Sequence, residues 1–247
     1  MEFARLTRYG LLSVSGADAR EFLHAQLTSD LLGLPQDRAT LAGWCTAKGR
    51  LLASFLVIPR GEAFLLQLAR DIAPTIGKRL AMFVLRAKVK IADETDRWSQ
   101  FGLWQPSPGE PYSLSVAEAG IRVKMGDTRT LLLSQSAPQG TEVDEARWTL
   151  EEIRAGRPLI TGATQELFVP QMVNLHTLGG VDFKKGCYPG QEIVARTQYR
   201  GQLKRHMVHA RALGEVRPGS DFQGGTVVDA APAEGGSELL AVVPIPE

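Results

Sequence analysis

Residues 183–192 read Phe183-Lys184-Lys185-Gly186-Cys187-Tyr188-Pro189-Gly190-Gln191-Glu192. Cys187 follows two lysines and precedes a predicted helix start, where Pro189 suits the first helical position. Adjacent ammonium groups and a helix N-terminus both favour the thiolate form of a cysteine. The glycines on either side allow tight turns and close approach of another group. The pattern fits a reactive thiol presented on a sharp loop, and equally a buried cysteine that acts as a small hydrophobe.

This run belongs to a longer signature that extends over most of residues 9–205. Its C-terminal half contains Gln165-Glu166-Leu167-Phe168-Val169-Pro170-Gln171, Asn174-Leu175, Gly179-Gly180 and Val194-Ala195-Arg196. Its N-terminal half contains Ser15-Gly16-Ala17-Asp18, Gln26-Leu27-Thr28-Ser29-Asp30, Cys45 and Ala47-Lys48-Gly49. Together these motifs resemble the YgfZ family, whose members are folate-binding relatives of the T-protein, the aminomethyltransferase of the glycine cleavage system.

The composition is that of a soluble globular protein. The chain has 247 residues and a net charge of +1, which argues against a strongly polyanion-binding protein. No stretch approaches the roughly 18–20 apolar residues of a membrane span, and residues 1–5 do not begin a secretion signal. Two unmatched cysteines predict free thiols and a cytoplasmic location. The four histidines form no zinc motif, so no metal site is expected.

The hydrophobic pattern mixes strands and helices without a regular βαβ alternation, which predicts the α+β class. We expect a helix capped by Ser15, with Asp18 three residues on in a capping-box arrangement, and further helices at residues 72–83 and 143–155. Strands are expected at 10–15, 41–46, 51–58, 63–68, 88–92, 100–104, 121–125 and 131–134, and strands alone from residue 204 on. The resemblance implies a T-protein-like fold, with two interleaved α+β subdomains over residues 1–200 and a small C-terminal β-barrel over 201–247.

The resemblance also assigns roles to individual residues. Cys187 would be the functional thiol and Lys185 its electrostatic helper. Tyr9 and Trp148 match positions that line the folate site, where tetrahydrofolate or another folate would bind, although either ring could instead be a core aromatic. By resemblance, such proteins support the assembly or repair of iron–sulfur enzymes, including those that modify tRNA.

Two positions depart from the related patterns. The aspartate that lies beside the reacting folate nitrogen in the T-protein falls on Ala53, which cannot relay a proton. This argues against an enzyme of the aminomethyl-transferring kind and for an accessory protein. The family's Glu-Ala-Gly becomes Arg154-Ala155-Gly156, which replaces an acceptor for the pterin edge by a donor. Glu151 or Glu152, one turn earlier, are alternative acceptors.

A basic segment follows the cysteine motif. It contains Arg196, Arg200, Lys204, Arg205 and Arg211, with Tyr199 among them. A solvated charged face, a site for the polyglutamate tail of folate, a phosphate site and a weak RNA contact all fit this pattern. The alternatives to a folate-binding accessory protein are therefore a folate-dependent one-carbon transferase and a direct tRNA-binding module.

Overall fold

The computed structural model describes residues 1–117 and 120–245. The chain divides into two compact units whose segments alternate along the sequence. Unit 1 comprises residues 1–22, 31–40 and 56–148, and unit 2 comprises residues 23–30, 41–55 and the chain from residue 149 on. Three sheets and a few helices make up these units, which confirms the α+β class. The helices are α1 (Ala19–Gln26), α2 (Ala73–Ala81), α3 (Glu145–Arg154) and α4 (Gln191–Tyr199).

Unit 1 contains a six-stranded sheet in the order β11-β1-β7-β10-β9-β8. All neighbouring strands are antiparallel except the pair β1 and β11. Phe3, Phe101, Leu103 and Leu132 form its apolar core. The strands are β1 (Glu2–Arg5), β7 (Ser99–Trp104), β8 (Leu114–Ala117), β9 (Gly120–Lys124), β10 (Arg129–Ser134) and β11 (Thr141–Glu142).

A second sheet has the order β3-β4-β5-β2-β6. Every residue of β4 except Arg60 is buried, as expected from a continuous apolar run covered on both faces. β4 begins in unit 2 beside β3 and continues into unit 1, where it pairs with β5 from Leu56 on. Helix α2 packs against β2 and β6. The strands are β2 (Tyr9–Ser15), β3 (Thr40–Cys45), β4 (Leu51–Arg60), β5 (Ala63–Ala69) and β6 (Lys90–Asp93).

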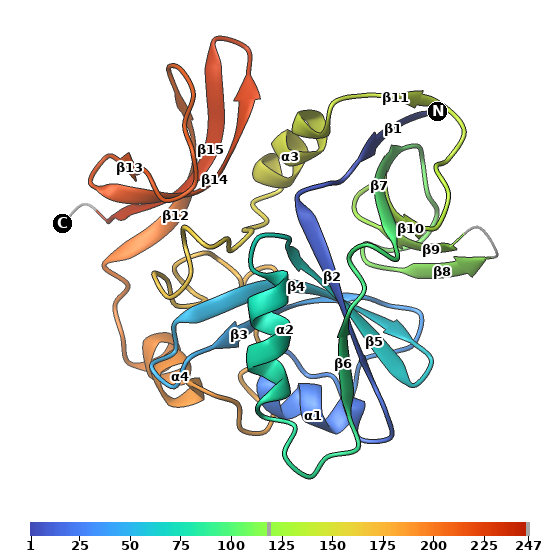
Figure 1. The fold of residues 1–247 in the computed structure, drawn as a ribbon. Coiled ribbons are helices and arrows are strands. Elements are labelled where there is room, and N and C mark those ends of the chain that lie inside the picture. Colours follow the sequence, from blue (N-terminus) through green and yellow to red (C-terminus); the bar gives the residue numbers. More distant parts are fainter. Residues whose placement is uncertain (118–119, 246–247) are drawn as a thin grey trace. The chain divides into compact units, whose positions relative to one another are not determined.

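The C-terminal part of unit 2 is a four-stranded antiparallel sheet in the order β12-β15-β14-β13. Its strands curl (Figure 1), and β14 carries an irregularity between Val227 and Asp229. Val227, Leu239, Ala241 and Val243 form the core on one face. The strands are β12 (Arg205–Ala212), β13 (Asp221–Phe222), β14 (Gly225–Ala233) and β15 (Gly236–Pro244).

Local details differ from the sequence expectation at the first helix. Ser15 is the last residue of β2 and not a helix cap, and α1 begins at Ala19. The carboxylate of Asp18 accepts the backbone N–H of Lys88 at 2.6 Å, so it joins this turn to the segment before β6. Asp18 therefore does not complete a capping box on α1, because its carboxylate is bound by a distant segment of the chain.

Candidate functional site

The thiol loop, residues 183–190, is held at its start by Asp182. The carboxylate of Asp182 accepts the backbone N–H groups of Lys184 at 2.7 Å and Lys185 at 3.1 Å. The backbone N–H of Asp182 in turn donates to the carbonyl oxygen of Thr28 at 2.9 Å. An aspartate that bonds the N–H groups two and three residues on shapes a tight turn. The sequence therefore builds this loop from a polar turn anchored on residues that follow α1.

At its other end the thiol loop requires a glycine. Gly190 has φ of 79°, in the left-handed region, and a Cβ there would lie 2.4 Å from the carbonyl oxygen of Thr46. The same Cβ would lie 2.6 Å from the Cα of Gly49. Any side chain would thus separate the loop from the turn between β3 and β4. The two motifs around Gly49 and Gly190 are therefore in direct contact.

The ammonium group of Lys185 is directed to the C-terminal end of α1. It donates to the carbonyl oxygens of His24 and Leu27, the latter at 2.6 Å, and lies 5.0 Å from the centre of the Tyr188 ring. Such carbonyls lack partners within a helix and favour a cation. Burial lowers the pKa of Lys185 to about 8, while the Asp30 and Asp182 carboxylates act in the opposite direction. The role of Lys185 as helper of the thiol stays a prediction.

The two cysteines lie in opposite surroundings, although both belong to unit 2. Cys187 is exposed on the thiol loop, whereas Cys45 is 2% exposed at the end of β3. Burial raises the pKa of the Cys45 thiol to about 12. Cys45 is therefore an inert core residue, and Cys187 is the thiol that solvent and a partner can reach.

The helix that follows the thiol loop starts later than expected. Helix α4 begins at Gln191, and Gly190 is its N-cap, so the prediction of Pro189 as first helical residue is wrong. The left-handed conformation of Gly190 separates Pro189 from the helix. Because a helix dipole acts mainly within its first turn, Cys187 gains less from α4 than the sequence suggested.

His24 and Asp30 border the thiol loop, and sequence reasoning missed this pair. His24 Nδ1 lies 3.1 Å from Asp30 Oδ1. A Cβ built on Gly186 would have His24 Nε2 as its neighbour at 3.6 Å, so the imidazole faces the residue before Cys187. The presence of Asp30 in the N-terminal motif was the only sequence signal for this pair. The arrangement gives the thiol loop an imidazole oriented by a carboxylate.

Tyr9 lies buried at the start of β2 and is one of the residues that line a pocket of about 170 Å³ in unit 1. Gln100 Nε2 donates to the backbone oxygen of Tyr9 at 3.2 Å, and Gln67 Nε2 donates to Gln100 Oε1 at 2.7 Å. Pockets for drug-sized ligands measure about 300–1,000 Å³. This pocket therefore suits a ring-sized fragment and not a whole folate.

Trp148 lies inside unit 1. It is 2% exposed, and its ring packs edge-to-face on Trp104 with centres 5.9 Å apart. A Cβ on Gly102 would lie 2.1 Å from Trp148 Cε3, and the guanidinium of Arg129 lies 5.0 Å from the ring centre. Trp148 does not line the Tyr9 pocket within the described residues. As placed, the two aromatic residues form no shared slot for folate, and their assignment stays a prediction.

The positions that depart from the family pattern are integrated into the fold of unit 2. Ala53 is fully buried in β4, and the neighbouring Ser54 donates to the carbonyl oxygen of Pro158 at 3.0 Å and accepts the N–H of Ile160 at 3.0 Å. Glu152, one of the alternative acceptors, is bound by Arg157 through two hydrogen bonds of 2.7 and 2.5 Å. Neither Ser54 nor Glu152 thus presents a group for proton transfer.

Arg154 binds a buried carboxylate of the C-terminal sheet. Its Nε and NH2 donate to the two oxygens of Glu238 at 3.0 and 2.8 Å, and Glu238 is 1% exposed. His209 and Arg211 also contact this carboxylate, at 2.9 and 3.0 Å. The bond from Arg154, followed by those from His209 and Arg211, lowers the pKa of Glu238 to about 2 against the effect of burial. The arginine therefore joins α3 to β15.

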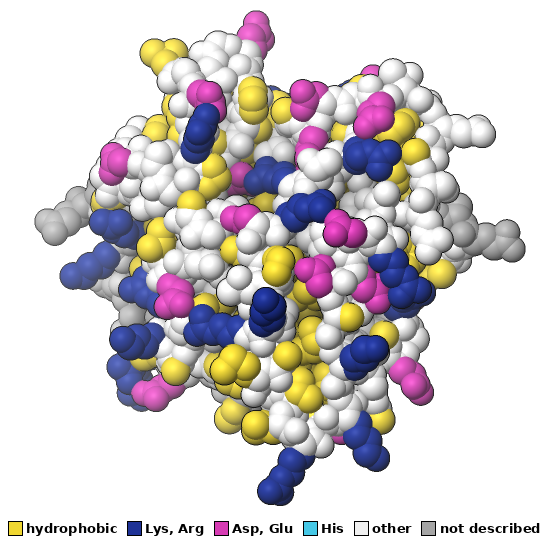
Figure 2. All heavy atoms as spheres, in the orientation of Figure 1, with side chains coloured by type: hydrophobic (Ala, Val, Ile, Leu, Met, Phe, Trp, Pro, Cys, Tyr) yellow, Lys and Arg dark blue, Asp and Glu magenta, His cyan; other side chains and the backbone are white. Residues whose placement is uncertain are grey.

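The basic segment forms part of the surface around α4 and the start of β12. Figure 2 shows Lys and Arg side chains gathered along the edge where Figure 1 places these elements. Tyr199 is 69% exposed and contacts Phe183 of the thiol loop edge-to-face, with ring centres 6.1 Å apart. Arg196 pairs with Glu192 at 2.7 Å. The surface beside the thiol loop is thus basic and carries an exposed aromatic ring.

Comparison with known proteins decides the family. The chain is 30% identical to the tRNA-modifying protein YgfZ of Aliivibrio fischeri, over 98% of this chain and 84% of the relative. It is 31% identical to the tRNA-modifying protein YgfZ of Edwardsiella ictaluri, over 97% and 83%. The chain belongs to the YgfZ family. No family model matches it.

The fold of this YgfZ-family chain is that of the T-protein. The glycine cleavage system aminomethyltransferase T from Bartonella henselae superposes with a TM-score of 0.77, covering 98% of this chain and 78% of that structure, at 15% identity. The predicted family and fold are both confirmed. Among the residues described, no helix is long and apolar enough to cross a membrane. Within residues 1–117 and 120–245, His, Cys, Asp and Glu side chains form no group of three suited to a metal ion.

Proposed function

We propose that this YgfZ-family chain is a cytoplasmic accessory protein that supports the assembly or repair of iron–sulfur enzymes, among them tRNA-modifying ones, through Cys187. The exposure of Cys187 on an anchored loop is the observation that carries the proposal. A thiolate is a nucleophile and a ligand for iron, and exposure lets a client enzyme reach it. The names of the related proteins, which refer to tRNA modification, support the link to that class of clients.

Folate is the cofactor that the family resemblance suggests, and we propose it as a ligand. The pterin ring would bring a flat heterocycle with hydrogen-bonding edges. Tyr9 and the polar groups beside it would contact one ring, while Trp148 would support that surface from the core. The pocket volume of about 170 Å³ admits a fragment only. Titration with tetrahydrofolate, followed by tryptophan fluorescence, tests this part alone.

Aminomethyl transfer is the rival reading for the same fold. A buried Ala53 cannot supply the carboxylate that the transferase uses, and Ser54 is bonded to the backbone at Pro158 and Ile160. We therefore expect no turnover of aminomethylated carrier protein. Formation of methylene-tetrahydrofolate by the purified chain would favour the transferase over the accessory protein.

Complementation tests the accessory function. The chain is expressed in a bacterial strain that lacks its own YgfZ protein, and tRNA nucleosides made by iron–sulfur enzymes are quantified. Cys187→Ser should abolish the rescue, because a hydroxyl stays protonated and binds iron poorly. Cys45→Ala is the matched control: it removes the buried thiol and should rescue fully. Full rescue by folded Cys187→Ser would show that the thiol loop acts through its shape.

Direct tRNA binding is a second candidate function, and the basic surface around α4 favours it. Arg196, Arg200 and Tyr199 lie together around a shallow pocket of this helix. Arginine and an exposed aromatic ring suit an unpaired nucleotide. Binding through phosphates would weaken steeply between 50 and 200 mM salt. A filter-binding titration at two salt concentrations with Tyr199→Ala as a variant tests this function.

A further inference from the structure

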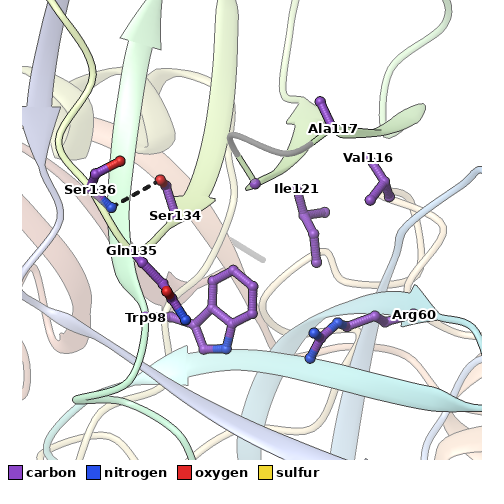
Figure 3. Close-up of a pocket in the computed structure, with 9 residues that line it drawn as sticks. Arg60, Trp98, Val116, Ala117, Ile121, Ser134, Gln135 and Ser136 are labelled. Carbon is purple, nitrogen blue, oxygen red and sulfur yellow. Dashed lines mark hydrogen bonds between the residues drawn. The ribbon is translucent and has the colours of Figure 1, made fainter.

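A second, larger pocket lies in unit 1 and shares Trp98 with the Tyr9 pocket described above. Its volume is about 560 Å³, which is within the range of roughly 300–1,000 Å³ for small-molecule sites. It opens where β8, β9, the end of β10 and the residue before β7 approach the end of β4 (Figure 3). None of its described lining residues belongs to the thiol loop. The pocket therefore needs an explanation of its own.

Trp98 and Arg60 together form one side of the pocket, which we call the Trp98–Arg60 platform. The guanidinium carbon of Arg60 lies 5.1 Å from the centre of the indole ring. Trp98 Nε1 donates to Glu94 Oε2 at 2.9 Å, which fixes the orientation of the ring. Indole and guanidinium planes are both surfaces on which heterocyclic rings stack. The Trp98–Arg60 platform is therefore suited to a planar ligand.

The wall opposite the platform is apolar. Val116 of β8 and Ile121 of β9 are cross-strand partners, and both side chains point toward the space above Trp98 and Arg60 (Figure 3). Ile121 is buried, whereas Val116 is 71% exposed at the rim. An exposed valine loses its contact with water when a flat ring fills the gap. The two faces together favour a ring lying between them.

The third side of the pocket is polar. Ser134 Oγ accepts the backbone N–H of Ser136 at 3.1 Å, and Gln135 directs its amide toward Trp98 (Figure 3). An amide offers both a donor and an acceptor to the edge of a heterocycle. Arg60 is the one charged side chain among the described lining residues. A ligand with a single anionic group would match this balance of charge.

From this geometry we propose that the pocket binds a planar nitrogen heterocycle that carries one anionic group, of the size of a nucleoside monophosphate. The ring would lie between the Trp98–Arg60 platform and the wall formed by Val116 and Ile121. Gln135 would bond the edge of the ring, and the guanidinium of Arg60 would pair with the phosphate. No bond is made or broken in this step, so the site is one of binding and not of catalysis.

Calorimetric titration of the full chain tests the site, with adenosine 5′-monophosphate, adenosine and ribose 5-phosphate as three separate probes. The monophosphate should bind more tightly than either fragment, because only it both stacks on the Trp98–Arg60 platform and pairs its phosphate with the guanidinium of Arg60. Trp98→Leu should weaken its binding at least tenfold, whereas Trp98→Phe should retain most of it. Arg60→Gln should weaken binding of the monophosphate more than binding of adenosine, because adenosine loses only the stacking contact and the monophosphate also loses the partner of its phosphate. Arg86→Gln removes an exposed arginine outside the pocket lining and is the matched control.

A spectroscopic measurement on the unmodified chain covers the case in which Trp98→Leu does not fold. The monophosphate should shift the indole N–H resonance of Trp98 and leave that of the core residue Trp44 in place. Absence of binding at millimolar monophosphate would overturn the proposal. Equal effects of Arg60→Gln and Arg86→Gln would also overturn it, as would ribose 5-phosphate binding as tightly as the whole nucleotide.

Discussion

The surroundings of Trp148 and the thiol loop differ in what can reach them. Trp148 is buried against Gly102, Trp104 and Arg129. Cys187, in contrast, is exposed on a loop whose two ends are held by contacts to other segments. A substitution in the first region removes packing and therefore reports on the fold. A substitution in the second removes a reactive atom and little else. The same family resemblance pointed to both residues, and of these two only Cys187 is exposed.

The largest expected effect separates the two cysteines. At neutral pH, iodoacetamide should alkylate Cys187 at least about 1,000-fold faster than Cys45, because a pKa near 12 leaves little thiolate and burial blocks access. Peptide mass spectrometry after timed quenching measures both rates. In denaturant the two rates should converge, which controls for intrinsic reactivity. Comparable labelling of Cys187 and Cys45 in the folded chain would show that burial does not protect Cys45.

Trp148→Ala should lower the free energy of unfolding by about 3–5 kcal/mol, as expected for deletion of a fully buried aromatic ring. Urea denaturation measures this loss. Cys187→Ser, in the exposed thiol loop, is the control and should change the free energy of unfolding by no more than about 0.5 kcal/mol. If Trp148→Ala stays stable yet loses tetrahydrofolate binding, the ring lines a ligand channel. Trp148 would then not be a core residue, contrary to the comparison with Cys187.

Arg154→Glu should reduce stability by about 1–3 kcal/mol, because it sets a second carboxylate against the buried Glu238; the value allows for the half-exposed arginine. Arg154→Met should cost less. Glu238 titrates near pH 2 when folded and near 4.5 otherwise, so its contribution is present above pH 4.5 and is lost as the pH falls toward 2. Urea denaturation midpoints of the unmodified chain, Arg154→Glu and Arg154→Met between pH 2 and 6 measure this loss of stability. An unchanged acid profile in Arg154→Met would show that His209 and Arg211 suffice.

The smallest effect concerns Lys185. Its pKa is about 8 in the folded chain and about 10.5 when unfolded, so between these values the unfolded chain binds more protons at this site. The stability of the unmodified chain relative to Lys185→Met should therefore rise with pH from 8 to 10.5. The rise should be about 1 kcal/mol, since the side chain is partly exposed. A flat difference would mean that the carbonyls of His24 and Leu27 keep the ammonium charged.

The amino-acid sequence by itself determined the features that depend on neighbouring residues. Apolar runs marked β3 and β4, and with them the burial of Cys45. Gly186, Pro189 and Gly190 marked 183–190 as a loop, since glycine and proline favour turns over strands and helices. The family motifs identified the T-protein-like fold, because they mark where distant segments meet, as Gly49 and Gly190 do.

Only the tertiary structure decided what each side chain touches. The residues that pack against Trp148 include Gly102 and Trp104. The carbonyls that bind Lys185 belong to His24 of α1 and to Leu27 just after it, over 150 residues earlier in the chain. The sequence showed that Arg154 replaces a family glutamate, but only the structure shows that it binds Glu238. The pairing of Trp98 with Arg60 was likewise not predicted from the sequence. Local propensity specifies backbone conformation, whereas these contacts depend on how strands far apart in the chain pack against one another.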